Sequence, residues 1–202
     1  GNRCVVADPR YLKANAEALQ FLADLMNVHH VAPTTGQMRD TGTYDAFMNG
    51  MVNMCAYGRW ACLKFQHIKK FKWNVAPLPM KKRKGGTFFT VGYAIAKESK
   101  RTEEAWTLVK YLTGPEGQVQ TAESALAIPT RNSLARSDHF MHAPVLPSYV
   151  DSQPYLDAIP YSEPTPVHLR WTEIDAALPV FLDRVFLGRE KAIDVLPRLQ
   201  VE

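Results

Sequence analysis

The sequence offers the cluster Tyr57-Gly58-Arg59-Trp60 as its most informative candidate for binding chemistry. The cluster follows an apolar run, residues 51–57, that predicts a buried strand, and it opens residues 59–70, which predict a helix. Ligands of open α/β sheets lie outside the carboxyl ends of the strands, where Trp60 would stand. The flat face of an indole suits a sugar ring, whose C–H groups are apolar on one side. Spacing alone, however, favours a core position for Trp60.

The other tryptophans pose the same choice between ligand stacking and core packing. Trp171 precedes a predicted helix and follows a proline-rich loop, so both roles stay open. Trp73 lies on a predicted strand and Trp106 on the inward face of a predicted helix. Both are therefore expected in the core.

No catalytic signature accompanies these aromatic residues. The sequence lacks Gly-x-Ser-x-Gly, a Walker loop, Gly-x-Gly-x-x-Gly and His-Glu-x-x-His, so an enzyme is not expected. His139 and His142 have i, i+3 spacing, but no second pair with ligand spacing accompanies them. We therefore expect no metal site and no cofactor.

Charge and cysteine content exclude little by themselves. The net charge is +4, and the basic run Lys81–Lys84 is short and has no interleaved aromatic residue, which favours a solvated loop over a nucleic-acid-binding surface. A basic interaction module is kept as an alternative. The three cysteines, Cys4, Cys55 and Cys62, cannot all pair with one another. The last two have apolar neighbours and are expected to be buried and inert.

Helices alternating with short strands must position these residues, and this alternation indicates an α/β fold. An N-cap at Asp8 with Pro9 predicts a helix start. The predicted helices cover residues 9–29, 44–49, 59–70, 102–113, 115–122, 171–187 and 190–196, and the predicted strands cover residues 51–57, 73–78 and 87–96.

Several segments, taken in order, resemble the extracellular solute-binding proteins of bacterial ABC sugar importers, the maltose-binding-protein-like family. Phe47–Trp60 resembles the family's F-x-x-G-x-x-A-M-x-x-x-G-x-W stretch, with Asn53 in place of the usual Ala. Trp73–Pro79 resembles its W-x-V-x-P-L-P strand. Further matches follow at Asp8-Pro9, Val31–Pro33, Gly92–Ile95, Ala105-Trp106, Leu112–Gly117, Pro129–Ser133, Trp171 and Gly188-Arg189.

The resemblance implies a periplasmic-binding-protein-like fold of type II, in which two α/β lobes hold a solute between them. This chain resembles only the C-terminal half and is expected to be a truncated piece. Residues 1–79 and 137–202 would form the C-terminal lobe, residues 80–86 a basic crossover loop, and residues 87–136 a segment that normally packs on the N-terminal lobe. That segment is expected to expose an apolar face, which favours a homodimer or strand exchange.

The resemblance also implies the function: a non-catalytic subunit, exported to the periplasm or cell surface, that captures a sugar and delivers it to a membrane permease. A non-sugar solute, such as glycerol phosphate or a polyamine, is the alternative within the same fold. With one lobe missing, binding is expected to be weak or absent, since closure of two lobes holds the solute. The ligand-binding residues implied by the resemblance are Trp60, Tyr57, Arg59, Gly92, Tyr93, Arg131 and Trp171.

Overall fold

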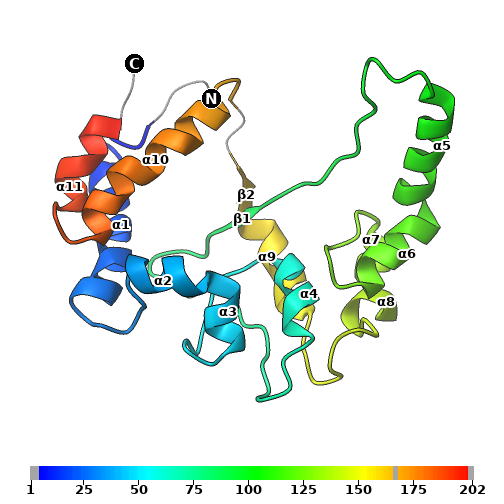
Figure 1. Cartoon of the computed structure of the whole chain (residues 1–202), viewed down its shortest axis with the longest axis horizontal. Coiled ribbons are helices and arrows are strands. Elements are labelled where there is room, and N and C mark those ends of the chain that lie inside the picture. Colours follow the sequence, from blue (N-terminus) through cyan, green and yellow to red (C-terminus); the bar gives the residue numbers. More distant parts are fainter. Residues whose placement is uncertain (1–4, 166–167, 200–202) are drawn as a thin grey trace. The chain divides into compact units, whose positions relative to one another are not determined.

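The computed structural model describes residues 5–165 and 168–199, and the described chain is mostly helical (Figure 1). It divides into two compact units, each with its own internal packing. The first unit contains the described residues up to 54 together with residues 168–199, and the second contains residues 55–165. No helix among the described residues combines the length and the apolar character needed to cross a membrane.

The first unit is built from helices around a small apolar core. Ala16 and Ala23 lie two turns apart on one face of α1, and they pack in one cluster with Val185 of α10. Small side chains on α1 allow the neighbouring helices to approach closely. The elements of this unit are α1 (Leu12–Asn27), α2 (Thr35–Thr41), α3 (Thr43–Met48), α10 (Trp171–Phe186), α11 (Ala192–Val195) and the 3-10 helix η3 (Leu196–Leu199).

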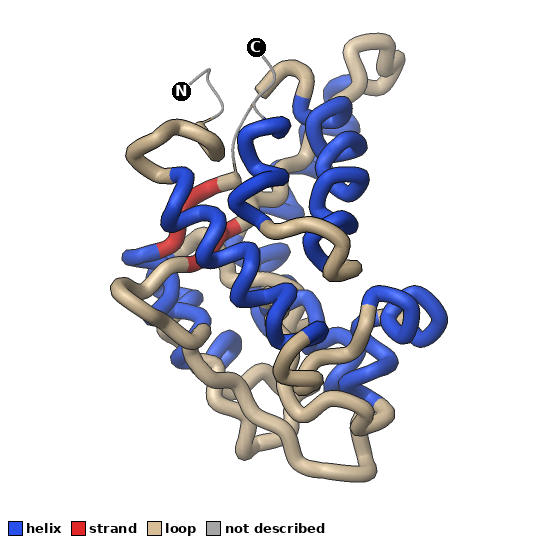
Figure 2. The backbone as a smooth tube through the Cα atoms, turned by 90° about the vertical axis from the view of Figure 1, so that its left-hand side faces the viewer, coloured by secondary structure: helices blue, strands red, loops and turns tan. Residues whose placement is uncertain are grey.

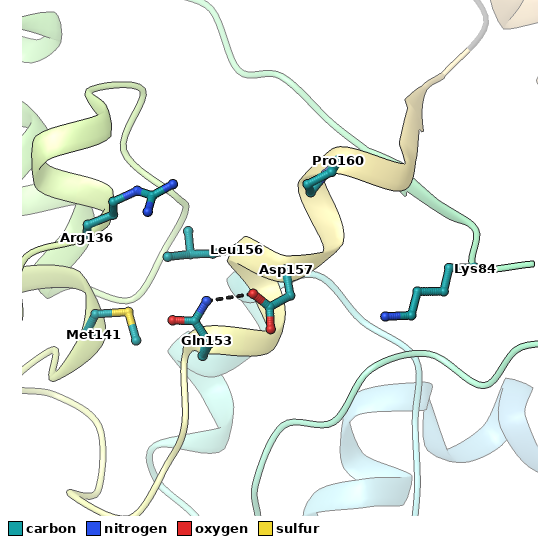
Figure 3. Close-up of a pocket in the computed structure, with 7 residues that line it drawn as sticks. All are labelled: Lys84, Arg136, Met141, Gln153, Leu156, Asp157 and Pro160. Carbon is teal, nitrogen blue, oxygen red and sulfur yellow. Dashed lines mark hydrogen bonds between the residues drawn. The ribbon is translucent and has the colours of Figure 1, made fainter.

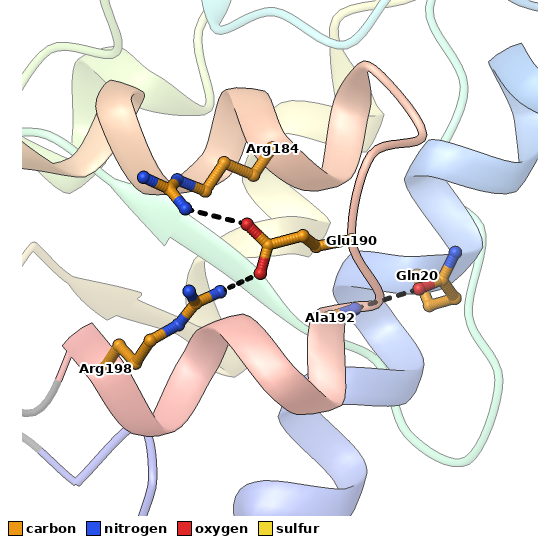
Figure 4. A network of polar contacts seen from close by, with 5 residues as sticks. All are labelled: Gln20, Arg184, Glu190, Ala192 and Arg198. Carbon is orange, nitrogen blue, oxygen red and sulfur yellow. Dashed lines mark hydrogen bonds and ion pairs between the residues drawn. The ribbon is translucent and has the colours of Figure 1, made fainter.

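A polar network holds the C-terminal helices of this unit (Figure 4). Glu190 accepts hydrogen bonds from Arg184, at 2.8 Å, and from Arg198. The backbone N–H of Ala192 donates to Oε1 of Gln20 on α1 at 3.0 Å. These contacts join α1, α10 and the α11–η3 segment, and the guanidinium groups hold the pKa of the Glu190 carboxyl below its ordinary value.

The second unit contains short helices and one small sheet, seen as two red segments in Figure 2. Its strands, β1 (Gly86–Phe88) and β2 (Ser162–Pro164), are parallel, with Gly86 opposite Ser162. The helical elements are η1 (Arg59–Ala61), α4 (Cys62–Phe65), α5 (Thr102–Thr113), α6 (Pro115–Glu123), α7 (Asn132–Ala135), α8 (Asp138–Met141), α9 (Gln153–Ala158) and η2 (Ile159–Tyr161).

Most of the strand predictions are wrong. Residues 51–57 and 73–78 form no strand, and the strand predicted over residues 87–96 is reduced to the three residues of β1. A strand requires a neighbour that pairs with its N–H and C=O groups. Within residues 5–165 and 168–199, the β1–β2 pair is the only such ladder.

Two helix predictions also need correction. The first helix begins at Leu12 instead of Pro9, because Asp8 binds the side chain of Arg10 in a preceding turn. The helix predicted over residues 59–70 ends at Phe65, where a hydrogen-bonded turn follows and Ile68 is buried. The predictions over residues 102–113, 115–122 and 171–187 agree with α5, α6 and α10 to within a residue at each end.

The core predictions for three side chains have mixed outcomes. Trp73 is buried, with 6% of its surface exposed, as predicted. Trp106, in contrast, is 49% exposed on α5, so its predicted core position is wrong. Among the cysteines, Cys62 is buried as predicted but Cys55 is exposed, and Cys4 lies outside the described residues.

The segment from residue 87 to residue 136 does expose apolar side chains, as predicted. Within the second unit, α5 packs mainly against α6. The exposed side chains include Phe88, Phe89, Val91, Tyr93, Trp106, Leu108, Tyr111 and Leu126.

Candidate functional site

Trp60 stands on η1 with 39% of its surface exposed, at the edge of the second unit's aromatic core. Its ring meets the ring of Phe89 edge to face, with the centroids 5.5 Å apart and the planes at 81°. Phe89 follows β1 and is itself exposed. Trp60 and Phe89 thus form an aromatic surface that adjoins Gly58, and we name these three residues the Trp60 platform.

Gly58 permits the indole to lie directly on the chain. A Cβ at this position would stand 2.0 Å from Cζ3 of Trp60 and 2.3 Å from Cη2. The backbone there, with φ −78° and ψ 175°, is one that any residue adopts. Gly58 therefore leaves room for the ring that covers it, while the conformation of the turn would accept any residue.

Arg59 points into the unit instead of toward the platform. Only 3% of its surface is exposed, and its guanidinium carbon lies 3.9 Å from the ring centroid of Phe140. Nη1 donates to Oγ of Ser152 at 2.8 Å, and Nη2 donates to the carbonyl of Phe140 at 3.1 Å. Burial lowers the pKa of this guanidinium. Arg59 consequently has no free face for a ligand.

A second group of aromatic rings, Tyr57, Phe65 and Trp73, packs together in the same unit. Tyr57 meets Phe65 edge to face at 6.1 Å, and Phe65 meets Trp73 at 5.7 Å. Tyr57 is half-buried, so it belongs mainly to this packing. On the next helical turn, Sγ of Cys62 lies 3.5 Å from the hydroxyl of Tyr155, and burial raises the pKa of both groups.

A hollow of about 670 Å³ lies beside α9 in the same unit (Figure 3). Figure 3 shows Arg136 and Lys84 on either side of α9, and the amide of Gln153 donates to Oδ1 of Asp157 at 2.7 Å. Its walls therefore offer both cations and a carboxylate. The lining residues are Lys84, Arg136, Met141, Gln153, Leu156, Asp157 and Pro160.

The remaining predicted site residues occupy separate places. Gly92 and Tyr93 are exposed in the extended chain after β1, and Tyr93 lines a second hollow of about 290 Å³ against α5 and α6. Arg131 is exposed immediately before α7. Trp171 is half-buried as the first residue of α10, in the first unit. Tyr57, Arg59 and Trp60 are neighbours in sequence within the second unit, where Arg59 is buried and Trp60 is exposed.

The histidines lie in ordinary surface contacts. Nδ1 of His139 lies 2.7 Å from Glu123, and Nδ1 of His142 lies 3.0 Å from Asp138. No group of three or more His, Cys, Asp or Glu side chains suited to a metal ion occurs in the part of the chain that the structure describes.

Sequence reasoning missed three residues: Phe89 of the Trp60 platform, and Gln153 and Asp157 of the hollow beside α9. Phe89 was placed on a predicted strand, and alternation along a strand does not reveal which aromatic ring meets Trp60. Gln153 and Asp157 lie in a proline-rich stretch with weak periodicity. The i, i+4 spacing of these two polar residues, which matches one face of a helix, was the available signal.

Comparisons with known proteins identify the fold and the family. The ABC substrate-binding protein Lmo0181 from Listeria monocytogenes, solved in complex with cycloalternan, matches 98% of this chain at 21% identity with a TM-score of 0.84. The chain spans 50% of that protein's length, so the likeness confirms part of a periplasmic-binding-protein-like fold. No curated protein matches the sequence significantly. Residues 6–148 match the family model described as bacterial extracellular solute-binding protein. The chain therefore belongs to the family of bacterial extracellular solute-binding proteins.

Proposed function

We propose that this chain contributes a carbohydrate-binding surface to the solute-binding subunit of an ABC importer, with the Trp60 platform stacking on a sugar ring. The observation that carries the proposal is a part-exposed indole that lies against the backbone of Gly58 and meets the ring of Phe89 edge to face. The structural relative's complex with the oligosaccharide cycloalternan supports the same chemistry. The surface acts by binding and not by catalysis.

The stacking interaction follows from the shape of both partners. The C–H groups on one face of a sugar ring pack on the apolar indole face, while the hydroxyl groups point sideways to polar side chains. Gly92, Tyr93 and Arg131 are proposed as further contacts in the second unit, since each is exposed. Trp171, half-buried in the first unit, is proposed separately as a ligand contact of that unit. Arg59 is left out of the contacts because its guanidinium is buried.

The wider role follows from the family. We propose that the protein acts outside the cytoplasm, in the periplasm or at the cell surface, and hands its solute to a membrane permease. Residues 1–79 and 137–202 are proposed to belong to one lobe, residues 80–86 to a crossover, and residues 87–136 to a segment that packs on the other lobe.

A second solute class is favoured by one observation. Lys84 and Arg136 line the hollow beside α9, and two cations suit a phosphate group. Glycerol phosphate or a related phosphoester is therefore the second candidate solute. A polyamine would require more carboxylates than the single one of Asp157 in that hollow.

The test is a titration of the protein with oligosaccharides followed by NMR chemical shifts at millimolar sugar. Trp60→Ala should weaken the affinity by more than about 1 kcal/mol, which corresponds to about fivefold or more. Trp106→Ala is the matched control, since Trp106 is also an exposed tryptophan of the second unit. An unchanged affinity of Trp60→Ala would refute the site. Affinity of the chain alone should be weak, and a submicromolar value for a simple sugar would contradict the need for a second lobe.

Association of two copies is a further part of the proposal. The exposed apolar residues from Phe88 to Leu126 favour a homodimer or strand exchange. Light scattering of dilute protein tests this directly, and a monomer at all concentrations would contradict it.

A further inference from the structure

We propose that Arg59 is a positioning residue of the Trp60 platform: its buried hydrogen bonds to α8 and to the start of α9 fix the orientation of η1 and thereby of the neighbouring indole. This role rests on the proposed function, because Arg59 would hold the ring that is proposed to stack on the sugar. It assigns to Arg59 a role different from direct contact with the ligand.

The contacts of Arg59 join elements far apart in sequence. Nη1 donates to Oγ of Ser152, 93 positions along the chain, and Nη2 donates to the carbonyl of Phe140, 81 positions along. Ser152 is fully buried and precedes the first residue of α9, while Phe140 lies within α8. The guanidinium therefore fastens the short turn η1 to two helices at once.

Because Trp60 lies on the same short turn, the hydrogen bonds of Arg59 also fix the direction of the Trp60 side chain. A 3-10 helix has three residues per turn, so adjacent side chains point about 120° apart. Arg59 points inward and Trp60 points outward from adjacent positions of the same three-residue turn. Rotation of η1 would withdraw the Arg59 hydrogen bonds and turn the indole away from Phe89 together.

The charge of Arg59 argues against a role in simple core packing. Within the residues that the structure describes, no carboxylate forms an ion pair with it, and its buried Nε has no hydrogen-bond partner. An apolar side chain of similar volume would avoid this desolvation cost. What an apolar side chain cannot supply is the pair of directed hydrogen bonds that defines the orientation of the turn.

The test compares Arg59→Met with Arg59→Lys and reads the state of Trp60. In each background, the emission and acrylamide quenching of Trp60 are obtained as the difference from the same protein carrying Trp60→Phe. Arg59→Met keeps the apolar stem and removes both hydrogen bonds, so Trp60 should become as readily quenched as a free indole. Arg59→Lys keeps the charge and one donor direction and should give a partial recovery.

Sugar affinity supplies the second readout. Arg59→Met should lose about as much affinity as Trp60→Ala, about fivefold. In a Trp60→Ala background, Arg59→Met should cause no further loss, because both changes act through the same ring. An equal loss in both backgrounds would overturn the inference, and so would unchanged quenching of Trp60 in Arg59→Met.

Failure of sugar binding at Trp60 and failure of the positioning role of Arg59 give different results. If Trp60→Ala leaves sugar affinity unchanged, the proposed function fails, and the quenching of Trp60 still decides whether Arg59 positions it. If Arg59→Met does not fold, as judged by near-UV circular dichroism, Ser152→Ala is used instead, because it removes the side-chain acceptor of Arg59 and leaves the backbone carbonyl of Phe140 in place. Ser152→Ala should raise the quenching of Trp60 by a smaller amount, and no change there would overturn the inference.

Discussion

Gly58→Ala should displace the Trp60 ring while leaving the second unit folded. The backbone at Gly58 is extended and open to alanine, so the turn itself needs no rearrangement. The added Cβ would lie 2.0 Å from Cζ3 of the indole. Carbon atoms pack at about 3.5–4.0 Å, so the ring must retreat by roughly 1.5 Å or more. Trp60 then loses its place against Phe89.

The energetic effect on folding is small because two contributions oppose each other. Loss of the edge-to-face contact with Phe89 costs about 0.5–1.5 kcal/mol. Alanine also lowers the conformational entropy of the unfolded chain, which stabilises the folded state by about 0.4–1 kcal/mol. The free energy of unfolding should therefore change by less than about 1 kcal/mol. We therefore expect Gly58→Ala to change the environment of the Trp60 ring while the free energy of unfolding stays nearly the same.

The assay combines urea unfolding with the emission and acrylamide quenching of Trp60, isolated by difference from Trp60→Phe. Gly85→Ala is the matched control, because a Cβ at Gly85 meets nothing within 4 Å. Gly58→Ala should alter the Trp60 emission and weaken sugar affinity, and Gly85→Ala should do neither. Identical Trp60 emission in Gly58→Ala and the parent protein would refute the packing of the indole on Gly58.

Three further predictions concern stability. Burial raises the pKa of Tyr155. The contribution of this phenol to the free energy of unfolding is therefore complete below its unfolded-state pKa of about 10 and is lost as the pH rises further. Urea unfolding at alkaline pH should therefore depend less steeply on pH in Tyr155→Phe, and equal slopes would contradict the burial of this phenol. Arg184 and Arg198 lower the pKa of Glu190. The contribution of this carboxylate to the free energy of unfolding is therefore present above about pH 4.3 and is lost as the pH falls below that value. In Glu190→Gln, the melting temperature should depend less steeply on pH in the acidic range. An unchanged dependence would count against the ion pairs of Glu190 with Arg184 and Arg198. Phe140→Ala should reduce the free energy of unfolding by about 3–5 kcal/mol in urea titrations, since the ring is fully buried, and a loss below about 1 kcal/mol would show that the site is loosely packed.

The helices that could be predicted from sequence are those whose own residues specify them. Pro115 opens α6 at the position where a missing N–H costs nothing, and the apolar spacing of residues 171–187 marks α10. Strands depend on a partner elsewhere in the chain. Residues 73–78 have the composition of a strand but no paired neighbour, so composition alone misleads there.

The site could be predicted only in part for the same reason. The resemblance to the family predicts Trp60 as a ligand-binding residue, whereas spacing alone favours a core position for it. The resemblance also predicts Arg59 as a ligand contact, but the hydrogen-bond partners of Arg59 lie 81 and 93 positions away. Those distant partners decide which side chain of η1 faces inward. Trp73 and Trp106 likewise look equally buried in sequence, and only the packing of other elements separates them.

The most direct test of the central claim is saturation-transfer NMR from the protein to cycloalternan and maltotriose at millimolar concentration. We predict transfer to the C–H protons of the sugar in the parent protein and in Trp106→Ala, and loss of that transfer in Trp60→Ala. Transfer that persists in Trp60→Ala, or that is absent from the parent protein, would contradict the proposal that the Trp60 platform binds carbohydrate.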